Sequence, residues 1–448
     1  MPVFPAGFLW GVSTSAHQFE GRNNHNQWSA WERQGRIRSG DRNRDACDWW
    51  RESRRDLDLC RELGLSAIRI SVDWGRLEPR EGQWSREAVH RYRSLLAEIR
   101  QAGMHCFVTM HHFTHPQWFE EQGAFLGRIA AERFAAHAER VVAEFGDLCS
   151  DWLTFNEPNV YSAFGYMFGE FPPGYRSRIR DCAMVMCNIH RAHGLAYERI
   201  HQLQRDARVG IATNWVEFEP ATNSGADRVL AFLYDAAFNR SSFQLLSGGS
   251  LPMPFKSLGT DVPEATGRID FVGLNVYNRL HVRAPWDEAS RKTGGIFVPR
   301  DVPQGDRGVE LPYGEAYPDA IVGAAREYAR LRVPLYLMEN GVPDRTDRLR
   351  PWVLVQSIRR VHELLSSGMD IRGYFHWSLV DNFEWNEGWT LRFGLYELDP
   401  RTQERKARSS AALYRGIIRH NELSDDLLQQ YAEPPAPTAD HWEQKQAL

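Results

Sequence analysis

The feature that most constrains the fold is a repeated alternation between short apolar runs and longer segments with helical periodicity. We count about eight such runs, and eight is the number of parallel strands that closes a barrel. The runs begin at Phe8, Ser66, His105, Asp151, Val209, Asp270, Pro334 and Ile371. The alternation predicts an α/β fold built from parallel βαβ units.

Three of the expected helices end at a glycine, which can adopt the left-handed conformation that terminates a helix. They span residues 51–63, 85–102 and 130–145, and the glycines are Gly64, Gly103 and Gly146. The repeated order of helix, glycine and strand supports the βαβ prediction more strongly than any single element does.

No repeat, low-complexity tract or linker divides the 448 residues, so we expect one domain. The prediction is a single (β/α)8 TIM barrel over residues 1–423, with long loops at the carboxyl ends of its strands. Residues 285–312 are rich in glycine, proline and charge, and we expect a long loop there, beyond the sixth strand and near the barrel mouth. Residues 424–448 are polar and contain prolines, which predicts a tail without a core of its own.

Composition excludes several classes of protein. The 54 Lys and Arg residues are spread along the chain and are outnumbered by 58 Asp and Glu, so we expect a solvated surface and no nucleic-acid partner. No apolar run reaches the roughly 18 residues of a membrane span, and the amino terminus lacks a basic signal region. The six cysteines contain no C-x-x-C pair and are interpreted as reduced. We therefore expect a cytoplasmic protein without membrane insertion, of open oligomeric state.

Two glutamates stand at the ends of expected strands. Glu157 closes the run DWLTFNE and Glu339 closes PLYLMEN. The carboxyl ends of the strands form the catalytic face of a barrel, so both side chains are expected at its mouth. Taken alone, either glutamate would more often be a helix-cap neighbour or a member of a loop ion pair. Together they indicate glycoside hydrolysis, which needs one protonated carboxyl and one carboxylate.

Four motifs in order along the chain then point to a family. They are SAHQFEG, TFNEP at 154–158, MENG at 338–341 and WSLVDNFEW. With them the chain resembles glycoside hydrolase family 1, the β-glucosidase family, from about Phe4 to Arg419. The resemblance implies a retaining β-glycosidase in which Glu157 is the acid/base and Glu339 the nucleophile.

The same resemblance implies roles for residues around the nucleophile. Arg69 matches the arginine beside it, where a fixed positive charge keeps the carboxylate ionised. Tyr277 matches a tyrosine that hydrogen-bonds this carboxylate, and Asn275 precedes it in the motif. Asn156 is similar to the residue that binds the sugar 2-OH. Taken alone, Arg69 could be an ordinary buried ion-pair partner and Tyr277 a core aromatic.

The remaining matches concern the sugar. Gln18 and His112 resemble residues that bind sugar hydroxyls, Glu384 and Trp385 those that hold the far side of the glycone, and Trp377 a stacking platform. Without the motifs, His112 could be a core histidine and the two tryptophans could be packing residues. These residues imply a small-molecule or oligosaccharide β-glycoside as the substrate.

Departures from the family pattern leave the glycone open. Phe113, Thr114, Val276 and Trp389 differ from the commonest residues near the sugar pocket, so glucose, galactose, fucose and mannose remain possible glycones. Glu384 favours an unphosphorylated sugar, because a carboxylate there would repel a phosphate. Glu157 favours an O-glycoside over a thioglycoside, because relatives that act on thioglucosides lack the acid/base glutamate.

A metal site is the other chemistry to weigh. His111, His112 and His115 lie close in sequence, but adjacent strand residues point to opposite faces and cannot converge on one ion. Neither a metal-binding HExxH motif nor a nucleotide-binding glycine loop occurs in the sequence. We expect no metal and no cofactor. Two rivals to hydrolysis remain: a transglycosylase using the same glycosyl-enzyme, and a barrel that binds sugar without catalysis.

Overall fold

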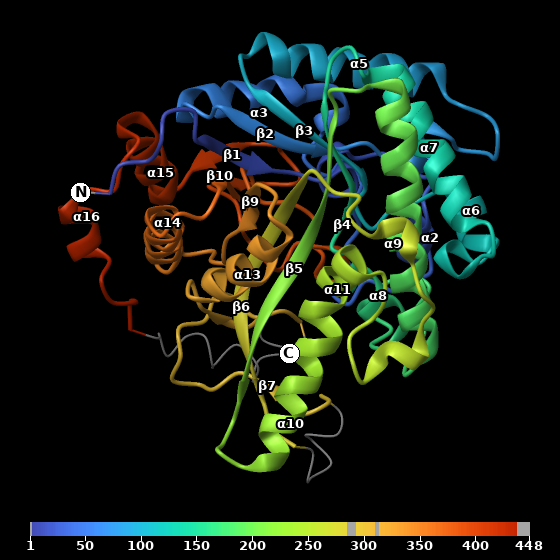
Figure 1. Ribbon diagram of the computed structural model, residues 1–448. Helices are drawn as coiled ribbons and strands as arrows, with labels where there is room; N and C mark the ends of the chain where they lie inside the picture. Colours follow the sequence, from blue (N-terminus) through green and yellow to red (C-terminus); the bar gives the residue numbers. More distant parts are fainter. Residues whose placement is uncertain (1, 285–292, 310–312, 437–448) are drawn as a thin grey trace.

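The computed structural model describes residues 2–284, 293–309 and 313–436 (Figure 1). Its parallel strands follow the order β5, β4, β3, β2, β1, β10, β9, β6, and pairing of β6 with β5 closes the barrel. The strands are β1 (Leu9–Ser13), β2 (Ala67–Ser71), β3 (His105–His111), β4 (Asp151–Asn156), β5 (Arg208–Pro220), β6 (Phe271–Val282), β9 (Leu335–Asn340) and β10 (Ile371–His376). Each overlaps one of the expected runs, and the predicted (β/α)8 barrel is confirmed.

Helices cover the outside of the barrel (Figure 1). The longer ones are α3 (Trp49–Leu63), α5 (Arg86–Gln101), α7 (Ala130–Phe145), α9 (Ile179–Leu203), α14 (Arg350–Ser366) and α15 (Ser409–His420). The shorter ones are α1 (Ala16–Glu20), α2 (Gln27–Arg33), α4 (Trp74–Leu77), α6 (Gln117–Glu121), α8 (Pro158–Tyr166), α10 (Gly225–Tyr234), α11 (Arg240–Gly248), α13 (Ala320–Tyr328) and α16 (Asp425–Gln430).

The glycine stops are confirmed for two of the three helices. Gly64 and Gly103 have φ values of 78° and 75° after α3 and α5. The prediction is wrong for Gly146, whose φ is −65°. Its backbone N–H continues the helical pattern by donating to the Val142 carbonyl (2.8 Å), and a β-carbon there would lie 2.7 Å from the same oxygen. Glycine is needed at this position for a close approach.

The expected long loop after the sixth strand is only partly a loop. β5 and β6 continue as a pair beyond the barrel, up to Pro220 and Val282. Two short strands, β7 (Ile296–Phe297) and β8 (Glu315–Ala316), pair antiparallel with β6. Residues 285–292 and 310–312 of the expected loop lie outside the described residues.

An apolar plug fills the barrel near the amino ends of its strands. Phe107 of β3 contacts three other aromatic rings edge-on, with centroids 5.6 Å away for Phe271, 5.1 Å for Tyr336 and 5.6 Å for Phe375. The plug is completed by Ala67, Leu153, Ala212 and Met338. These inward-facing side chains come from alternate strand positions, as in other packed barrels.

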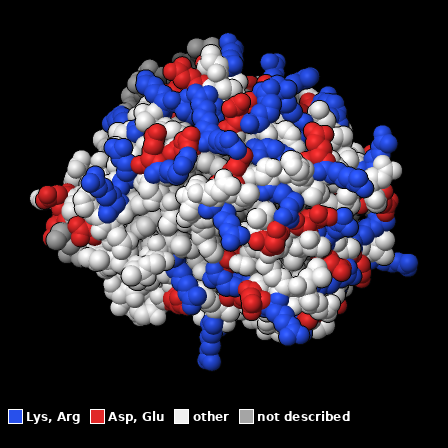
Figure 2. Space-filling view, turned by 90° about the horizontal axis from the view of Figure 1, so that it is seen from above, with Lys and Arg blue, Asp and Glu red and all other residues white. Residues whose placement is uncertain are grey.

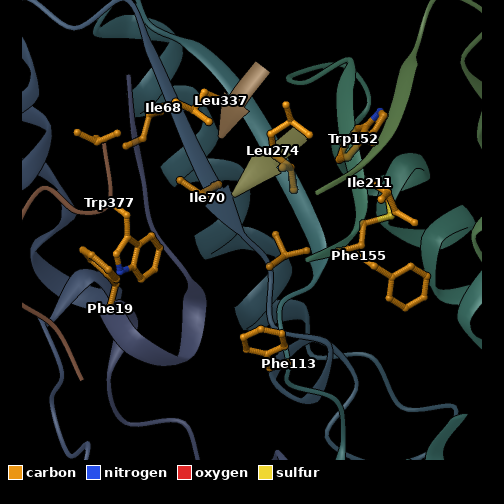
Figure 3. Close-up of a cluster of buried hydrophobic side chains, with 14 of the residues drawn as sticks. Phe19, Ile68, Ile70, Phe113, Trp152, Phe155, Ile211, Leu274, Leu337 and Trp377 are labelled. Carbon is orange, nitrogen blue, oxygen red and sulfur yellow. The ribbon is translucent and has the colours of Figure 1, made fainter. Parts of the chain in front are cut away.

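The outward faces of the same strands pack against the helices. Ile68 and Ile70 of β2 alternate with the inward-facing Ala67 and Arg69, and all four are buried. Figure 3 shows this outer layer, to which the neighbouring strands contribute apolar side chains. The strand side chains of this layer that the figure labels are Ile68, Ile70, Trp152, Phe155, Ile211, Leu274 and Leu337, and Phe19, Phe113 and Trp377 are labelled nearer the mouth.

A register shift near the end of β4 changes which side chains face inward. From Leu153 to Asn156, β4 advances three residues while β5 advances two. Simple alternation from Leu153 would turn Phe155 inward, but Phe155 packs outward against Phe134 of α7, with centroids 4.2 Å apart. The extra residue acts as a β-bulge, which re-aims the following side chains. Asn156 and Glu157 therefore face the mouth.

A second shift lies in β9. From Leu337 to Glu339, β9 advances two residues while β6 advances one. Because Tyr336 and Met338 belong to the plug, alternation alone would send Glu339 outward. The extra residue returns Glu339 to the inside.

The carboxyl-terminal segment differs from the expectation. Residues 425–430, placed in the predicted tail, form α16. Leu427, Leu428 and Tyr431 pack against the core, and Gln356 of α14 donates a hydrogen bond to the Tyr431 carbonyl (2.5 Å). The sequence of this segment is polar overall, but its few apolar residues pack against the core of the barrel. Residues 437–448 of the expected tail lie outside the described residues.

Charged side chains of both signs are mixed on the surface. Figure 2 shows one face of the molecule, on which Lys and Arg side chains are interspersed with Asp and Glu.

The cysteines form no disulfide bonds with one another, and all six are free thiols. Across residues 2–284, 293–309 and 313–436, no helix combines the length and the apolar character that crossing a membrane requires.

Candidate active site

Glu339 is held at the end of β9 by two opposed partners. One carboxylate oxygen accepts a hydrogen bond from the Arg69 guanidinium in a buried ion pair. The other accepts from the Tyr277 hydroxyl (2.6 Å). Both contacts favour the ionised form and fix the direction of the carboxylate.

Arg69 is itself fixed from three sides. Besides Glu339, its guanidinium donates to the Thr109 hydroxyl (2.9 Å) and to the Asn156 side-chain oxygen (2.6 Å). The side chain is completely buried, standing directly above the plug. The buried charge is tolerated because the guanidinium is paired with a carboxylate and donates to two further hydrogen-bond acceptors.

Glu157 follows the β4 bulge and adopts a left-handed conformation, with φ 44° and ψ 64°, before Pro158 begins α8. Its backbone N–H donates to the Ala212 carbonyl of β5 (2.7 Å). One oxygen of its carboxyl group accepts from the Asn214 amide (3.0 Å) and from the Asn275 amide (2.8 Å). The side chain is buried and directed into the mouth.

Asn275 links the two glutamates. Its amide donates to Glu157 and also to the Asn156 oxygen (3.0 Å), and its hydrogen bonding lowers the pKa of Glu339. Asn275 is paired in register with Glu339 across β6 and β9. Asn275 therefore places the carboxyl group of Glu157, from β4, near the strand position of Glu339 in β9.

Burial and charge separate the behaviour of the two carboxyl groups. The pKa of Glu157 is raised to about 8, first by burial and then by the negative charge of Glu339. Burial also raises the pKa of Glu339, but the positive charge of Arg69 and the hydrogen bond from Tyr277 oppose that rise. One group therefore holds a proton near neutral pH beside another that is stabilised as a carboxylate.

His112 follows β3 and lies beside both this network and the tryptophans. Its Nε2 is 3.1 Å from the Asn156 amide nitrogen. Its ring stacks near Trp377 and Trp385, with centroids 6.1 and 6.0 Å away. Burial, followed by the charge of Arg69, holds the pKa of His112 well below its ordinary value, so the ring is neutral.

Gln18 and Glu384 meet at the far side of the site. The Gln18 amide donates to Glu384 (3.1 Å) and to the Asn382 oxygen (2.8 Å). The pKa of Glu384 is raised to about 8 by burial and then by the charges of Glu339 and Glu157. The charges of Glu339 and Glu157 therefore reach Glu384 on the far side of the site.

Trp377 and Trp385 are both buried and supported from behind. Trp377 packs against Phe19, with centroids 6.2 Å apart, and the two lie side by side in Figure 3. Trp385 stacks between His112 on one face and His17 on the other, where the His17 centroid is 5.6 Å away. The eleven residues expected at the site thus gather at one end of the barrel, and their individual roles stay predictions.

Sequence reasoning missed several members of this site. Asn214, which binds Glu157, stands at the end of the run VGIATN, and the strand-end rule used for the glutamates could have found it. Thr109 lies inside β3 and carries no comparable signal. His17 was included only within a motif, and Tyr313 lies just beyond the expected loop.

The three neighbouring histidines do not converge. His111 stacks on His115, with Nε2 and Nδ1 3.3 Å apart, whereas His112 faces the tryptophans. Within the described part of the chain, no group of three or more His, Cys, Asp or Glu side chains is arranged to hold a metal ion.

Comparison with known proteins gives one family. The model of glycosyl hydrolase family 1 matches residues 1–423. The chain is 29% identical to a β-galactosidase of Sulfolobus acidocaldarius, over 98% of this chain and all of that protein. It is 30% identical to β-glucosidase A of Thermotoga maritima, over 94% of this chain and 99% of that protein.

Solved structures agree with the sequence relatives. A β-glycosidase from Pyrococcus horikoshii superposes with a TM-score of 0.87 at 34% identity, covering 97% of this chain and 99% of that one. The chain belongs to glycosyl hydrolase family 1 and is a glycoside hydrolase of the β-glucosidase-like type.

Proposed function

We propose that this enzyme is a retaining, exo-acting β-glycosidase that hydrolyses unphosphorylated β-O-glycosides by double displacement. Glu157 is the acid/base and Glu339 the nucleophile. The proposal is supported above all by the pair of carboxyl groups: Glu157 is buried, has a pKa of about 8 and is bound by Asn275, and Asn275 is paired in register with Glu339, a carboxylate held by Arg69 and Tyr277.

In the first step the Glu339 carboxylate attacks the anomeric carbon while Glu157 gives its proton to the leaving oxygen. The glycosidic C–O bond breaks, and an ester bond joins the sugar to Glu339. In the second step Glu157, now a carboxylate, takes a proton from water, and the water oxygen displaces Glu339. Two inversions leave the configuration of the sugar unchanged.

The charge of Glu339 couples the two steps. While ionised, Glu339 raises the pKa of Glu157 and helps it to keep its proton. Once Glu339 becomes a neutral ester, this contribution disappears and the pKa of Glu157 falls. The same residue can therefore serve first as an acid and then as a base.

The remaining residues bind the sugar in this proposal. Asn156 and His112, hydrogen-bonded to each other, bind hydroxyls near the reacting carbon, and Gln18 with Glu384 binds those on the far side. Trp377 provides apolar surface for sugar C–H groups, and Trp385, whose faces are covered by His112 and His17, helps to hold the far side of the glycone. Glu384 lies in the field of two other carboxyl groups, so a phosphate dianion bound there would meet strong repulsion.

The proposal is tested with a panel of nitrophenyl β-glycosides. The wild-type enzyme is expected to release nitrophenol from at least one glycone with retained configuration, and Glu339→Ala to reduce the rate by several orders of magnitude. Glu139→Ala, on the exposed face of α7, is the matched control and should leave the rate unchanged. Near-normal hydrolysis by Glu339→Ala would refute the proposal, and adding an alcohol acceptor measures how much sugar goes to transfer instead of water.

A further inference from the structure

Tyr313 is a residue at the mouth that the proposed mechanism leaves unused. It lies two residues before the start of β8, whose residues Glu315 and Ala316 pair with β6. The Tyr313 carbonyl accepts a hydrogen bond from the Asn278 amide (2.7 Å). Glu315 adds a bidentate ion pair with Arg279, at 2.8 and 2.7 Å. The backbone at Tyr313 is therefore anchored to the barrel strand that also carries Asn275 and Tyr277.

Gly314 explains how the chain approaches β6 so closely. Its φ is 136°, a value that favours glycine, and a β-carbon there would lie 2.6 Å from the Asn278 amide nitrogen. The absence of a side chain at 314 lets the backbone lie against Asn278. Tyr313 is thus the large side chain that this turn presents.

The ring of Tyr313 packs within an aromatic triad. Its centroid lies 5.9 Å from that of Tyr277 and 5.2 Å from that of Phe393, both in edge-to-face geometry. Tyr277 and Phe393 are themselves 6.1 Å apart. Since the Tyr277 hydroxyl donates to Glu339, Tyr313 lies one ring away from the proposed nucleophile.

The Tyr313 hydroxyl lies within the electrostatic influence of three glutamates and has no hydrogen-bond partner among the described residues. The pKa of Tyr313 is raised by burial and then by the negative charges of Glu384, Glu157 and Glu339. Among the described residues, no group hydrogen-bonds to this hydroxyl, and the side chain is only partly buried. The hydroxyl of Tyr277, by contrast, is already used. A phenol in this position is free to donate to, or accept from, a ligand hydroxyl.

We infer that Tyr313 is a specificity-determining residue whose hydroxyl hydrogen-bonds one hydroxyl group of the glycoside bound between Glu157, Glu339 and Glu384. The inference rests on the proposed function, because it deepens the description of the same site. A sugar that lacks this hydroxyl, or holds it in the other orientation, forfeits the contact. Tyr313, which is anchored to β6, thereby helps to determine which glycoside the enzyme accepts.

Tyr313→Phe isolates the hydroxyl, since it keeps the ring that supports Tyr277. For the best nitrophenyl β-glycoside we expect kcat/KM to fall on the order of tenfold, the effect of one hydrogen bond. Among analogues that each lack a single sugar hydroxyl, one should be turned over equally by both proteins. Tyr317→Phe is the matched control, because Tyr317 stacks under Arg279, with the ring centroid 3.9 Å from the guanidinium carbon, outside the site.

A binding measurement separates this inference from the proposed function. In Glu339→Gln protein, calorimetry with the same intact glycoside should show a Kd about tenfold higher when Tyr313→Phe is added. An unchanged Kd would overturn the inference, whatever the hydrolysis assays show. So would an equal loss of kcat/KM on every analogue, which would mean that Tyr313 acts through the position of Tyr277 rather than through a substrate contact.

Discussion

The two ends of the barrel interior are built from the same strands but have opposite properties. Near the amino ends, Phe107, Tyr336 and their neighbours form an apolar plug of packed side chains, with the Tyr336 hydroxyl bound by Arg208 at its border. A few residues further along, towards their carboxyl ends, the same strands lead to Thr109, His112 and Glu339, which belong to a hydrogen-bonded network with buried charge. One set of strands therefore supplies stability near its amino ends and the chemistry at its carboxyl ends.

Burial of side chains has opposite consequences at the two ends of the barrel. Burying aromatic surface in the plug favours folding. At the mouth, burial raises the pKa values of Glu157 and Glu384 to about 8, which means that folding opposes the ionisation of these groups. We expect changes in the plug to reduce stability and changes in the mouth to reduce activity.

The largest stability effect is expected in the plug. Phe107→Ala removes the ring that contacts three other aromatic residues and should lower the free energy of unfolding by about 3–5 kcal/mol. Because the carboxyl ends of the strands are untouched, kcat should stay near the wild-type value at temperatures where the protein is folded. Denaturant unfolding and steady-state kinetics check both parts.

Phe232→Ala is the control for that substitution, because Phe232 is 56% exposed on α10. It should change stability by no more than about 0.5 kcal/mol. A Phe107→Ala enzyme that is stable but inactive would contradict the separation of stability from activity, since it would show that the plug sets the geometry of the mouth.

A smaller effect on stability is expected from Glu157→Gln, and at higher pH this substitution should raise the Tm relative to wild type, whereas Phe107→Ala lowers stability. A carboxyl group whose pKa rises on folding to about 8 contributes stability at low pH that is lost as pH rises through this value. Glutamine does not titrate, so the Tm of Glu157→Gln relative to wild type should increase from pH 5 to pH 8. In the wild type, kcat/KM should fall above pH 8 as the acid form of Glu157 disappears.

Glu139→Gln serves as the control for the thermal measurement. This glutamate is exposed and pairs with Arg199 on the surface, so its Tm difference from wild type should hardly vary with pH. A Tm difference for Glu157→Gln that shrinks as pH rises would contradict the environment described for this carboxyl group.

The barrel could be predicted from the sequence because hydrophobic periodicity and glycine stops are local signals. The β-bulges could not. In β4 and β9 the amino-acid pattern continues without interruption, and only pairing with a neighbouring strand reveals the extra residue. Yet these two register shifts direct the side chains of Glu157 and Glu339 into the barrel mouth. The strand-end rule therefore named the right residues while lacking the reason that they converge.

Partners contributed by distant segments were harder to predict than the motif residues. Asn214 stands at a strand end and was within reach of the same rule. Tyr313 joins the site through β8, a two-residue strand that pairs far along the chain with β6 and has no periodicity of its own. The helix at 425–430 likewise depends on a packing surface that only the folded barrel provides.

The most direct test of the central claim is to identify the residue that becomes covalently attached to sugar. A dinitrophenyl 2-deoxy-2-fluoro-β-glycoside slows both steps by withdrawing charge at the anomeric carbon, while its good leaving group lets the first step outrun the second. Mass spectrometry of the trapped enzyme should show one added sugar, located by peptide mapping on Glu339. A sugar on another residue, or no adduct together with a product of inverted configuration, would contradict the account.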